Sequence, residues 1–386
     1  MSGSQQHKPR QAGFSLIELM IAVTLGLLIM TALVSLFVNT SRTNQEMAKT
    51  NSQIENARFA LNVLADDLMH GGYWGGFIPV FDDLTSTAVP TDAPAIVPEP
   101  CLAYSSWSTT LGHVNALIGI PLQFYNGVPT GCSSIVANKQ ADTDVVVVRH
   151  ADTCALIWNA TTSAFEPEDA NCDANLANAA YFQTSRCETD ASRYVLGTTG
   201  FTLQRRQCDS RLAPRYRLIS NIYYIRDYAV TAGDGIPTLV RSELGVTSSA
   251  PAQQAAVPLV EGIQGFRIEV GIDSLSETGA AINYAAAVNW QDTTRKIATN
   301  RGDGIPDGSP PFRHCAGGCT VEQLTNVSAA RVYVLARSNE TTPGYKDTKT
   351  YTLGTQTLGP FNDGFKRHVF STTVRFVNIT SRRETP

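Results

Sequence analysis

The chain is poor in charge and lacks the short motifs that mark common enzymes. Asp, Glu, Lys and Arg make up 17% of its 386 residues, and the formal net charge of −4 argues against broad affinity for nucleic acid. A nucleophile elbow, a phosphate-binding loop and a paired-histidine metal motif are all absent from the sequence. The six histidines are mostly isolated: His7, His70, His113, His150, His314 and His368. We therefore expect a protein that is not an enzyme, needs no cofactor and does not bind nucleic acid directly.

Proline is absent from residues 14–69, which leaves a long stretch free to form one helix. Its first part, 14–38, is an apolar run of about 25 residues, or about 37 Å of helix, enough to cross a hydrocarbon core of about 30 Å. Lys8 and Arg10 precede this run, and the positive-inside rule then predicts a cytoplasmic amino terminus. The run holds one charge, Glu18, whose carboxylate is costly in lipid unless a partner neutralises it.

The helix is predicted to continue beyond the membrane to about His70. After a polar stretch at 39–46, apolar side chains recur at helical spacing, at Ile54, Ala57, Leu61, Leu64 and Leu68. Gly71 and Gly72 then supply a stop signal. We expect an amphipathic half, 39–70, whose apolar stripe packs against the remainder of the protein as a core face.

The heptapeptide Gly13-Phe14-Ser15-Leu16-Ile17-Glu18-Leu19 stands between the basic leader and the apolar run. A secretory signal would place its small-residue cleavage site after the apolar core, whereas Gly13 lies before it. These residues resemble the class III signal of type IV prepilins and type II secretion pseudopilins. The resemblance implies cleavage after Gly13 by a prepilin peptidase, methylation of the new amino terminus at Phe14, and a role for Glu18 in subunit assembly.

The implied chemistry of assembly is a charge pair in lipid. The ammonium of Phe14 on an incoming subunit and the carboxylate of Glu18 on a neighbour would neutralise each other. A buried ion pair of this kind is weak evidence for stability but good evidence for register. The alternative is an ordinary signal anchor that carries a chance glutamate.

All eight cysteines follow the apolar run and would lie in an oxidising periplasm, where an even number predicts disulfides. They are Cys101, Cys132, Cys154, Cys172, Cys187, Cys208, Cys315 and Cys319. We expect local pairing of Cys101 with Cys132 and of Cys315 with Cys319, and the other pairings stay open. Zinc at His314-Cys315-x3-Cys319 or at His150-x-Asp152-x-Cys154 is the alternative. Neither has the paired CxxC spacing of a structural zinc site, so we expect no metal.

The remaining residues, 71–386, predict a β-rich globular domain. Strands are expected at 143–149, 217–228, 238–243, 265–271, 330–337 and 367–378. The continuous β-branched run 145–148 favours a central strand. Segments 150–210 and 272–320, rich in Ala, Asn, Asp, Thr and Gly, predict long loops that carry most of the cysteines.

The expected fold class is therefore α+β, with a long amino-terminal helix, membrane-spanning in its first half, packed on a β-rich, pilin-like globular domain with disulfide-bearing loops. Four parts are expected along the chain. They are a cytoplasmic leader at 1–13 that is cleaved, a transmembrane half-helix at 14–38, an amphipathic half-helix at 39–70 and a periplasmic or extracellular domain at 71–386.

The pentapeptide Gly-Asp-Gly-Ile-Pro occurs twice, at 233–237 and 302–306. Asp-Gly followed by proline predicts a turn. A calcium loop would need oxygen ligands at alternating positions before the glycine, but Arg301 and Thr299 stand at those positions in the second copy. The acidic pairs 66–67 and 82–83 are likewise expected at the solvated surface or at helix ends rather than in a catalytic site.

Several further stretches resemble the PilW family of minor pilins. They are 55–60, 71–75, 235–241, 344–351 and 366–375. The resemblance extends from end to end and implies a low-abundance subunit that primes type IV pilus assembly in the tip complex. It would support twitching motility, cell adhesion or DNA uptake.

The implied partners are other minor pilins and the major pilin, a PilY-type adhesin, the prepilin peptidase, the inner-membrane assembly platform and membrane lipid. The implied location is the inner membrane, with a single span and a periplasmic carboxyl terminus, and then the pilus tip at the cell surface. A minor pseudopilin of a type II secretion system and a signal-anchored periplasmic protein are the alternatives.

Overall fold

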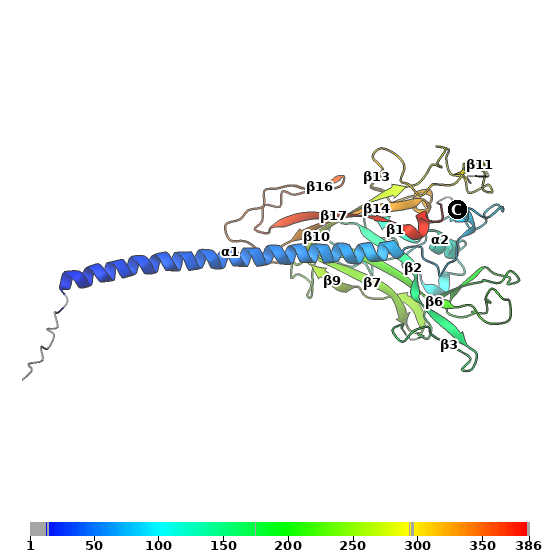
Figure 1. The fold of residues 1–386 in the computed structure, drawn as a ribbon, viewed down its shortest axis with the longest axis horizontal. Helices are drawn as coiled ribbons and strands as arrows, with labels where there is room; N and C mark the ends of the chain where they lie inside the picture. The colour runs from blue at the N-terminus through cyan, green and yellow to red at the C-terminus, as the bar shows by residue number, and fades with distance from the viewer. Residues whose placement is uncertain (1–12, 14, 174, 293, 295–296, 384–386) are drawn as a thin grey trace, which may run out of the picture. The chain divides into compact units, whose positions relative to one another are not determined.

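The computed structural model describes residues 13, 15–173, 175–292, 294 and 297–383. The chain divides into two compact units at residues 52 and 53. One continuous helix, α1 (Leu16–His70; Figure 1), contributes residues 16–52 to the first unit and residues 53–70 to the second. The long helix predicted from the absence of proline is therefore present.

Helix α1 ends at the predicted glycine pair. The N–H of Gly71 donates to the carbonyl of Asp67 at 3.2 Å, which continues the helical pattern for one residue. Gly72 then takes a φ of +79°, in the left-handed region where glycine has no steric penalty. A Cβ on Gly72 would also come within 3.2 Å of Ile379 and Pro121, so the turn packs closely on its neighbours.

The part of α1 in the second unit buries one face. The buried side chains on this face are Gln53, Ala57, Ala60, Leu61, Leu64 and Leu68. They include most of the predicted stripe, but Ile54 is only half-buried. Gln53 is buried in its place because its Nε2 donates to the carbonyls of Ala336 and Lys366, which satisfies the amide away from water.

The larger sheet of the second unit is antiparallel and has β2 and β6 at its centre. Its main path is β1 (Leu122–Tyr125), β2 (Val145–Asn159), β6 (Arg215–Arg226), β4 (Tyr181–Thr184) and β5 (Tyr194–Gly197). Branches are formed by β3 (Ala164–Pro167) on β2 and by β7 (Thr238–Thr247) on β6, and β7 in turn pairs with β8 (Ala250–Gln253) and β9 (Val257–Glu261). The β-branched run 145–148 is fully buried between β1 and β6, as predicted for a central strand.

The smaller sheet is also antiparallel. It runs in the order β13 (Phe312–Arg313), β10 (Ile263–Ile272), β14 (Val327–Arg337) and β17 (Arg367–Arg375). Both sheets, together with the second-unit part of α1, contribute side chains to one apolar core. The core is built of residues such as Leu64, Val146, Phe266, Val334 and Val374.

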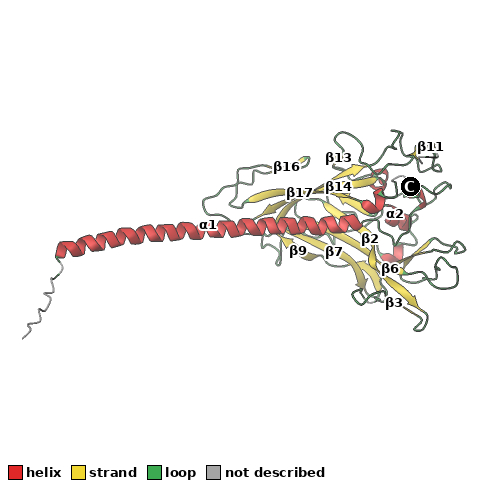
Figure 2. Cartoon of the chain, viewed as in Figure 1, coloured by secondary structure: helices red, strands yellow, loops and turns green. Residues whose placement is uncertain are grey.

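Short elements fill the remainder of the second unit (Figure 2). They are two hairpins, β11 (Trp290–Asp292) with β12 (Ile297–Ala298) and β15 (Tyr351–Leu353) with β16 (Gln356–Leu358), and the helices η1 (Val80–Asp82), η2 (Tyr104–Ser106), α2 (His113–Gly119), α3 (Val321–Thr325) and α4 (Val377–Thr380). The helix α3 begins with a capping box between Thr320 and Gln323, which satisfies two of its free backbone donors.

Two sequence-based expectations differ from the structure. Segment 150–210 is not one long loop, because β2 continues to Asn159 and β3, β4 and β5 join the larger sheet. A bulge between Ala151 and Ala155 interrupts the side-chain alternation of β2, which hides the second half of the strand from pattern reading. The last strand ends at Arg375 rather than at 378, since α4 begins at Val377.

Candidate assembly site

The first unit exposes an apolar helical surface. Leu16 is 78% exposed and Phe37 is 74% exposed, and large apolar side chains between them are exposed as well. Among the described residues, α1 is the one helix long and apolar enough to cross a membrane, and none of its most apolar stretch is buried within the protein. Such a surface needs lipid or other apolar helices around it.

Glu18 has a local role at the start of this helix. Its Oε2 accepts a hydrogen bond of 2.9 Å from the backbone N–H of Ser15. Ser15 precedes the first helical residue, so Glu18 supplies the second half of a capping box and satisfies a free donor at the helix end. A carboxylate in the first turn is also favoured by the helix dipole. Sequence analysis missed this role, although the Ser-x-x-Glu spacing carries its signal.

The predicted cleavage site lies directly before the helix. Gly13 is exposed, and a Cβ added there would meet nothing within 4 Å. Phe14, the expected methylated residue, lies outside the described residues. Cleavage between the two stays a prediction of the sequence.

The cysteines pair in sequence order into four disulfides. The pairs are Cys101–Cys132, Cys154–Cys172, Cys187–Cys208 and Cys315–Cys319. The two pairs expected from the sequence are among them. Each bond closes a local loop of the second unit, with sequence separations of 31, 18, 21 and 4 residues.

The two alternative zinc positions have other partners. Cys154 and Cys315 are bound in disulfides, which removes their thiolates as ligands. His150 Nε2 lies 3.0 Å from Asp67 Oδ1, and His314 Nε2 lies 3.3 Å from Asp144 Oδ1. No group of three candidate ligands occurs in the part of the chain that the structure describes.

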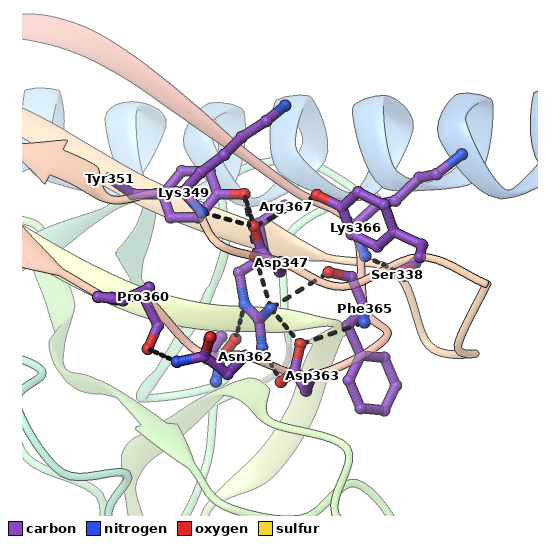
Figure 3. A network of polar contacts seen from close by, with 12 residues as sticks. Ser338, Asp347, Lys349, Tyr351, Pro360, Asn362, Asp363, Phe365, Lys366 and Arg367 are labelled. Atoms are coloured by element: carbon purple, nitrogen blue, oxygen red, sulfur yellow. Dashed lines mark hydrogen bonds and ion pairs between the residues drawn. The ribbon is translucent and has the colours of Figure 1, made fainter. Parts of the chain in front are cut away.

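A buried ion network joins two of the stretches that carry the PilW resemblance (Figure 3). The side chain of Arg367 is fully buried, and its Nη1 donates to Asp347 Oδ2 at 2.8 Å. Nη1 and Nη2 donate to the two oxygens of Asp363 at 2.7 Å and 2.6 Å, and Nε donates to Gln264 at 2.7 Å. The Tyr351 hydroxyl donates to Asp347 at 3.0 Å. Every charge of the network is therefore compensated by directed hydrogen bonds.

The network connects two stretches that are close in sequence but belong to different elements. Asp347 lies in 344–351 and Arg367 lies in 366–375, at the start of β17. Hydrogen bonds from Arg367 lower the pKa of Asp363 below its usual value. Burial alone would lower the pKa of Arg367, but its bonds to Asp363 and Asp347 outweigh that effect and raise it. The cluster thus fixes the edge strand β17 to the loop that precedes β15.

A second buried network involves the arginines at 382 and 383. Arg383 donates from Nε to Asp82 and from Nη1 to Asp273, both at 2.9 Å, and from Nη2 to Tyr284. Arg382 donates to the carbonyl of Gly72 and lies 3.7 Å from Asp82. This network ties the residues that follow α1 to the smaller sheet.

One member of each acidic pair lies at a helix end, which is one of the two expected positions, but is largely buried in the fold. Asp82 is 3% exposed and pairs with Arg383. Asp67 pairs with His150 and accepts from Asn221 at 2.8 Å, with its side chain 12% exposed. Both carboxylates serve the packing of the fold, because their partners come from distant strands and loops.

The two Gly-Asp-Gly-Ile-Pro copies form turns. Asp234 accepts from the N–H groups of Ile236, Val230, Ala229 and Thr231, and these bonds lower the pKa of Asp234 to about 2. In the second copy Asp303 accepts from the N–H of Ile305. Both aspartates bind their own backbone, as turn-forming Asp side chains commonly do.

The chain is similar to known pilus proteins in sequence and in fold. A family model described as type IV pilus-assembly protein W matches residues 222–378, and one described as the prokaryotic N-terminal methylation motif matches residues 8–34. No curated protein matches the chain. Among solved structures, the type IV-like pilin TTHA1219 from Thermus thermophilus is similar, at 14% identity and a TM-score of 0.29. The match covers 85% of this chain and 97% of that chain.

A methylation motif at the head of a long apolar helix, followed by a disulfide-bonded, β-rich domain, is the arrangement typical of a type IV pilin. The two family matches are consistent with a PilW-family pilin that carries a prepilin signal. The resemblance inferred from the sequence is confirmed. The matched segment 222–378 contains the whole of the Arg367 network.

Proposed function

We propose that this protein is a minor pilin that primes type IV pilus assembly and stays in the tip complex. The observation that carries the proposal is Glu18, a charge within the prepilin signal and on an exposed apolar helix. A carboxylate is costly in lipid without a partner, and the ammonium that cleavage would create at Phe14 of a neighbouring subunit is the matching charge.

The capping role of Glu18 is compatible with this pairing. A carboxylate has about four lone-pair positions, and the bond from Ser15 engages one oxygen. The other oxygen can accept from an ammonium on a neighbouring subunit. In this proposal, prepilin peptidase cuts after Gly13, the helix stays in the inner membrane, and Glu18 sets the register as subunits join.

The second unit supports a position at the tip. Spanning 53–386, it carries two sheets and loops closed by four disulfides, which is bulky for a subunit repeated along a thin filament. A subunit present once at an end has no such crowding. The proposed partners are other minor pilins, the major pilin, a PilY-type adhesin and the assembly platform. The proposed roles are motility, adhesion or DNA uptake.

We also propose that the protein has no catalytic activity. Neither family match describes an enzyme. The buried acids Asp67, Asp82 and Asp347 are each engaged by cationic partners that hold the fold together.

A deletion strain tests the proposal against the secretion alternative. Loss of surface pili and of twitching, with normal export of type II substrates, is the expected result. Mass spectrometry of sheared filaments should then find a methylated amino terminus at Phe14. Normal piliation with impaired secretion would instead assign the chain to a pseudopilin. An uncleaved amino terminus confined to the inner membrane would make it a signal-anchored protein.

A further inference from the structure

A cavity of about 430 Å³ lies in the second unit, apart from the assembly site and the ion networks described above. One wall is formed by the segment that the Cys101–Cys132 disulfide closes. The opposing residues come from four strands of the larger sheet: Arg149 of β2, Ser220 of β6, Leu244 of β7 and Gln253 of β8. Its volume falls in the range typical of small-molecule sites.

The cavity holds a buried cation that lacks an acidic partner. Arg149 is 1% exposed, and its Nη1 makes one long hydrogen bond, 3.4 Å, to the carbonyl of Ile120. Its Nη2 has no hydrogen-bond partner among the residues that the structure describes. The buried Arg367 and Arg383, by contrast, each contact two carboxylates. A buried charge left in this state is unfavourable for folding, so a ligand is the natural explanation for it.

A second unsatisfied polar side chain lines the same cavity. His113 is 1% exposed, and its Nε2 has no hydrogen-bond partner within the described part of the chain. Burial, and then the charge of Arg149, lower the pKa of His113 to about 4. The imidazole is therefore neutral at pH 7 and can donate one N–H to an anion without adding charge.

The remaining walls are largely apolar. The rings of Tyr104 and Trp107 lie in edge contact at 5.2 Å, and Leu117, Leu244 and Pro251 also line the space. The acid among the lining residues is Glu99, which is exposed and forms no ion pair with Arg149 in the described structure. One buried positive charge within apolar walls suits a ligand with one negative charge, because further charges would stay uncompensated at low dielectric.

We propose that this cavity binds an organic monocarboxylate, with the carboxylate on Arg149 and His113 and the apolar body against Trp107 and Leu244. The planar guanidinium fork matches the two oxygens of a carboxylate. A free carboxylic acid and the terminal carboxylate of a peptide share this chemistry. The proposal is independent of the proposed function, because no part of it requires filament assembly.

Calorimetric titration of the full chain in a neutral detergent tests the site, with phenylacetate as the probe. The matched variants are Arg149→Met and Arg211→Met, since Arg211 is exposed and lies outside the cavity. We expect saturable binding to the wild type and to Arg211→Met, and binding at least about tenfold weaker to Arg149→Met. Phenylacetamide, the uncharged analogue, should not compete.

A second readout separates lost binding from lost folding. Methionine in place of an uncompensated buried arginine should leave the melting temperature without ligand equal or higher. The tripeptide Gly-Gly-Phe, as free acid and as amide, identifies the source of the carboxylate. Tighter binding of the free acid than of phenylacetate points to a chain end, and weaker binding points to a free small molecule.

Three results would overturn the proposal. They are no saturable binding of phenylacetate or the free-acid tripeptide to the wild type, unchanged binding to Arg149→Met, and binding of inorganic phosphate as tight as that of phenylacetate. If Arg149→Met does not fold, the comparison of phenylacetate with phenylacetamide on the wild type decides.

Discussion

His150 Nε2 and Asp67 Oδ1 lie 3.0 Å apart and join the end of helix α1 to the central strand β2. Asn221 of β6 donates to the other carboxylate oxygen at 2.8 Å, so one aspartate connects three elements. Burial opposes charge on both partners. Even so, the hydrogen bond and the charge of Asp67 raise the pKa of His150, and the bonds from His150 and Asn221 lower the pKa of Asp67.

These pKa shifts predict how the contribution of the pair to folding stability changes with pH. The contribution of His150 is present below its ordinary pKa of 6.5 and is lost as pH rises through its raised value. The contribution of Asp67 is present above its ordinary pKa of 3.8 and is lost as pH falls through its lowered value. We expect His150→Gln to destabilise the protein by about 1–3 kcal/mol, with the largest effect between those two pH values.

Thermal unfolding of the full chain between pH 3 and pH 9 measures this difference. The control is Asp66→Asn, because Asp66 is exposed on the same turn of α1. A loss of stability in His150→Gln that does not change with pH would show that packing, and not the ion pair, accounts for it.

Replacement of Arg367 by methionine should be among the most damaging single changes in the second unit. It leaves the buried carboxylate of Asp347 without its cation, for an expected loss of about 3–5 kcal/mol in the free energy of unfolding. Urea unfolding measures the loss. Arg211→Met is the control, since the Arg211–Asp209 pair is exposed and should contribute little to stability.

The partner mutation supplies a second test of the same pair. Combining Arg367→Met with Asp347→Leu should cost less than the sum of the two single changes, because no buried charge is left unpaired. Strictly additive losses would contradict the view that these two residues act as a unit.

The disulfides should stabilise the protein by different amounts, according to the lengths of the loops that they close. The chain-entropy model gives about 3.7 kcal/mol for a separation of 31 residues and about 1.9 kcal/mol for a separation of 4. We therefore expect the double alanine variant of Cys101 and Cys132 to melt at a lower temperature than that of Cys315 and Cys319. Equal melting temperatures would mean that loop entropy does not govern their contribution.

Glutamine at position 18 separates the two roles of Glu18. Its side-chain carbonyl can still accept the bond from Ser15, so the helix cap survives while the charge is lost. We expect Glu18→Gln and Glu18→Ala both to abolish incorporation into filaments, and Glu18→Gln to leave the helix content by circular dichroism unchanged. Glu18→Asp keeps the charge and should retain part of the incorporation into filaments. Normal piliation by Glu18→Gln would contradict the ion-pair mechanism.

Much of the architecture could be predicted because its signals are local. The absence of proline and the apolar stripe indicate α1, and continuous β-branched residues indicate the centre of β2. The four-residue strand β4 gave no such signal, since alanine and asparagine precede it and its partner strand β6 begins about 30 residues further along the chain.

The buried charges could not be predicted from the sequence, because their burial depends on partners far along the chain. Asp82 is compensated by Arg383, which is 301 residues away. Arg149 follows the apolar run of β2, a position typical of the solvated end of a strand. Its side chain is nevertheless buried, and it lines a cavity together with residues 99–105. Charge patterning along a sequence reports only on residues that are close in the chain. The burial of these residues instead depends on contacts with residues far along the chain.

The burial of Arg382 and Arg383 has a consequence for the order of folding. Asp82 and Asp273 acquire their cation from Arg383, which follows them by 301 and 110 residues, so both carboxylates stay unpaired until that residue has been synthesised. β17, which completes the smaller sheet, also follows its partner β14 by about thirty residues. The second unit therefore reaches its stable state only after residues 367–383 have been made. Chains that terminate before Arg383 would lack that state and would be open to proteolysis.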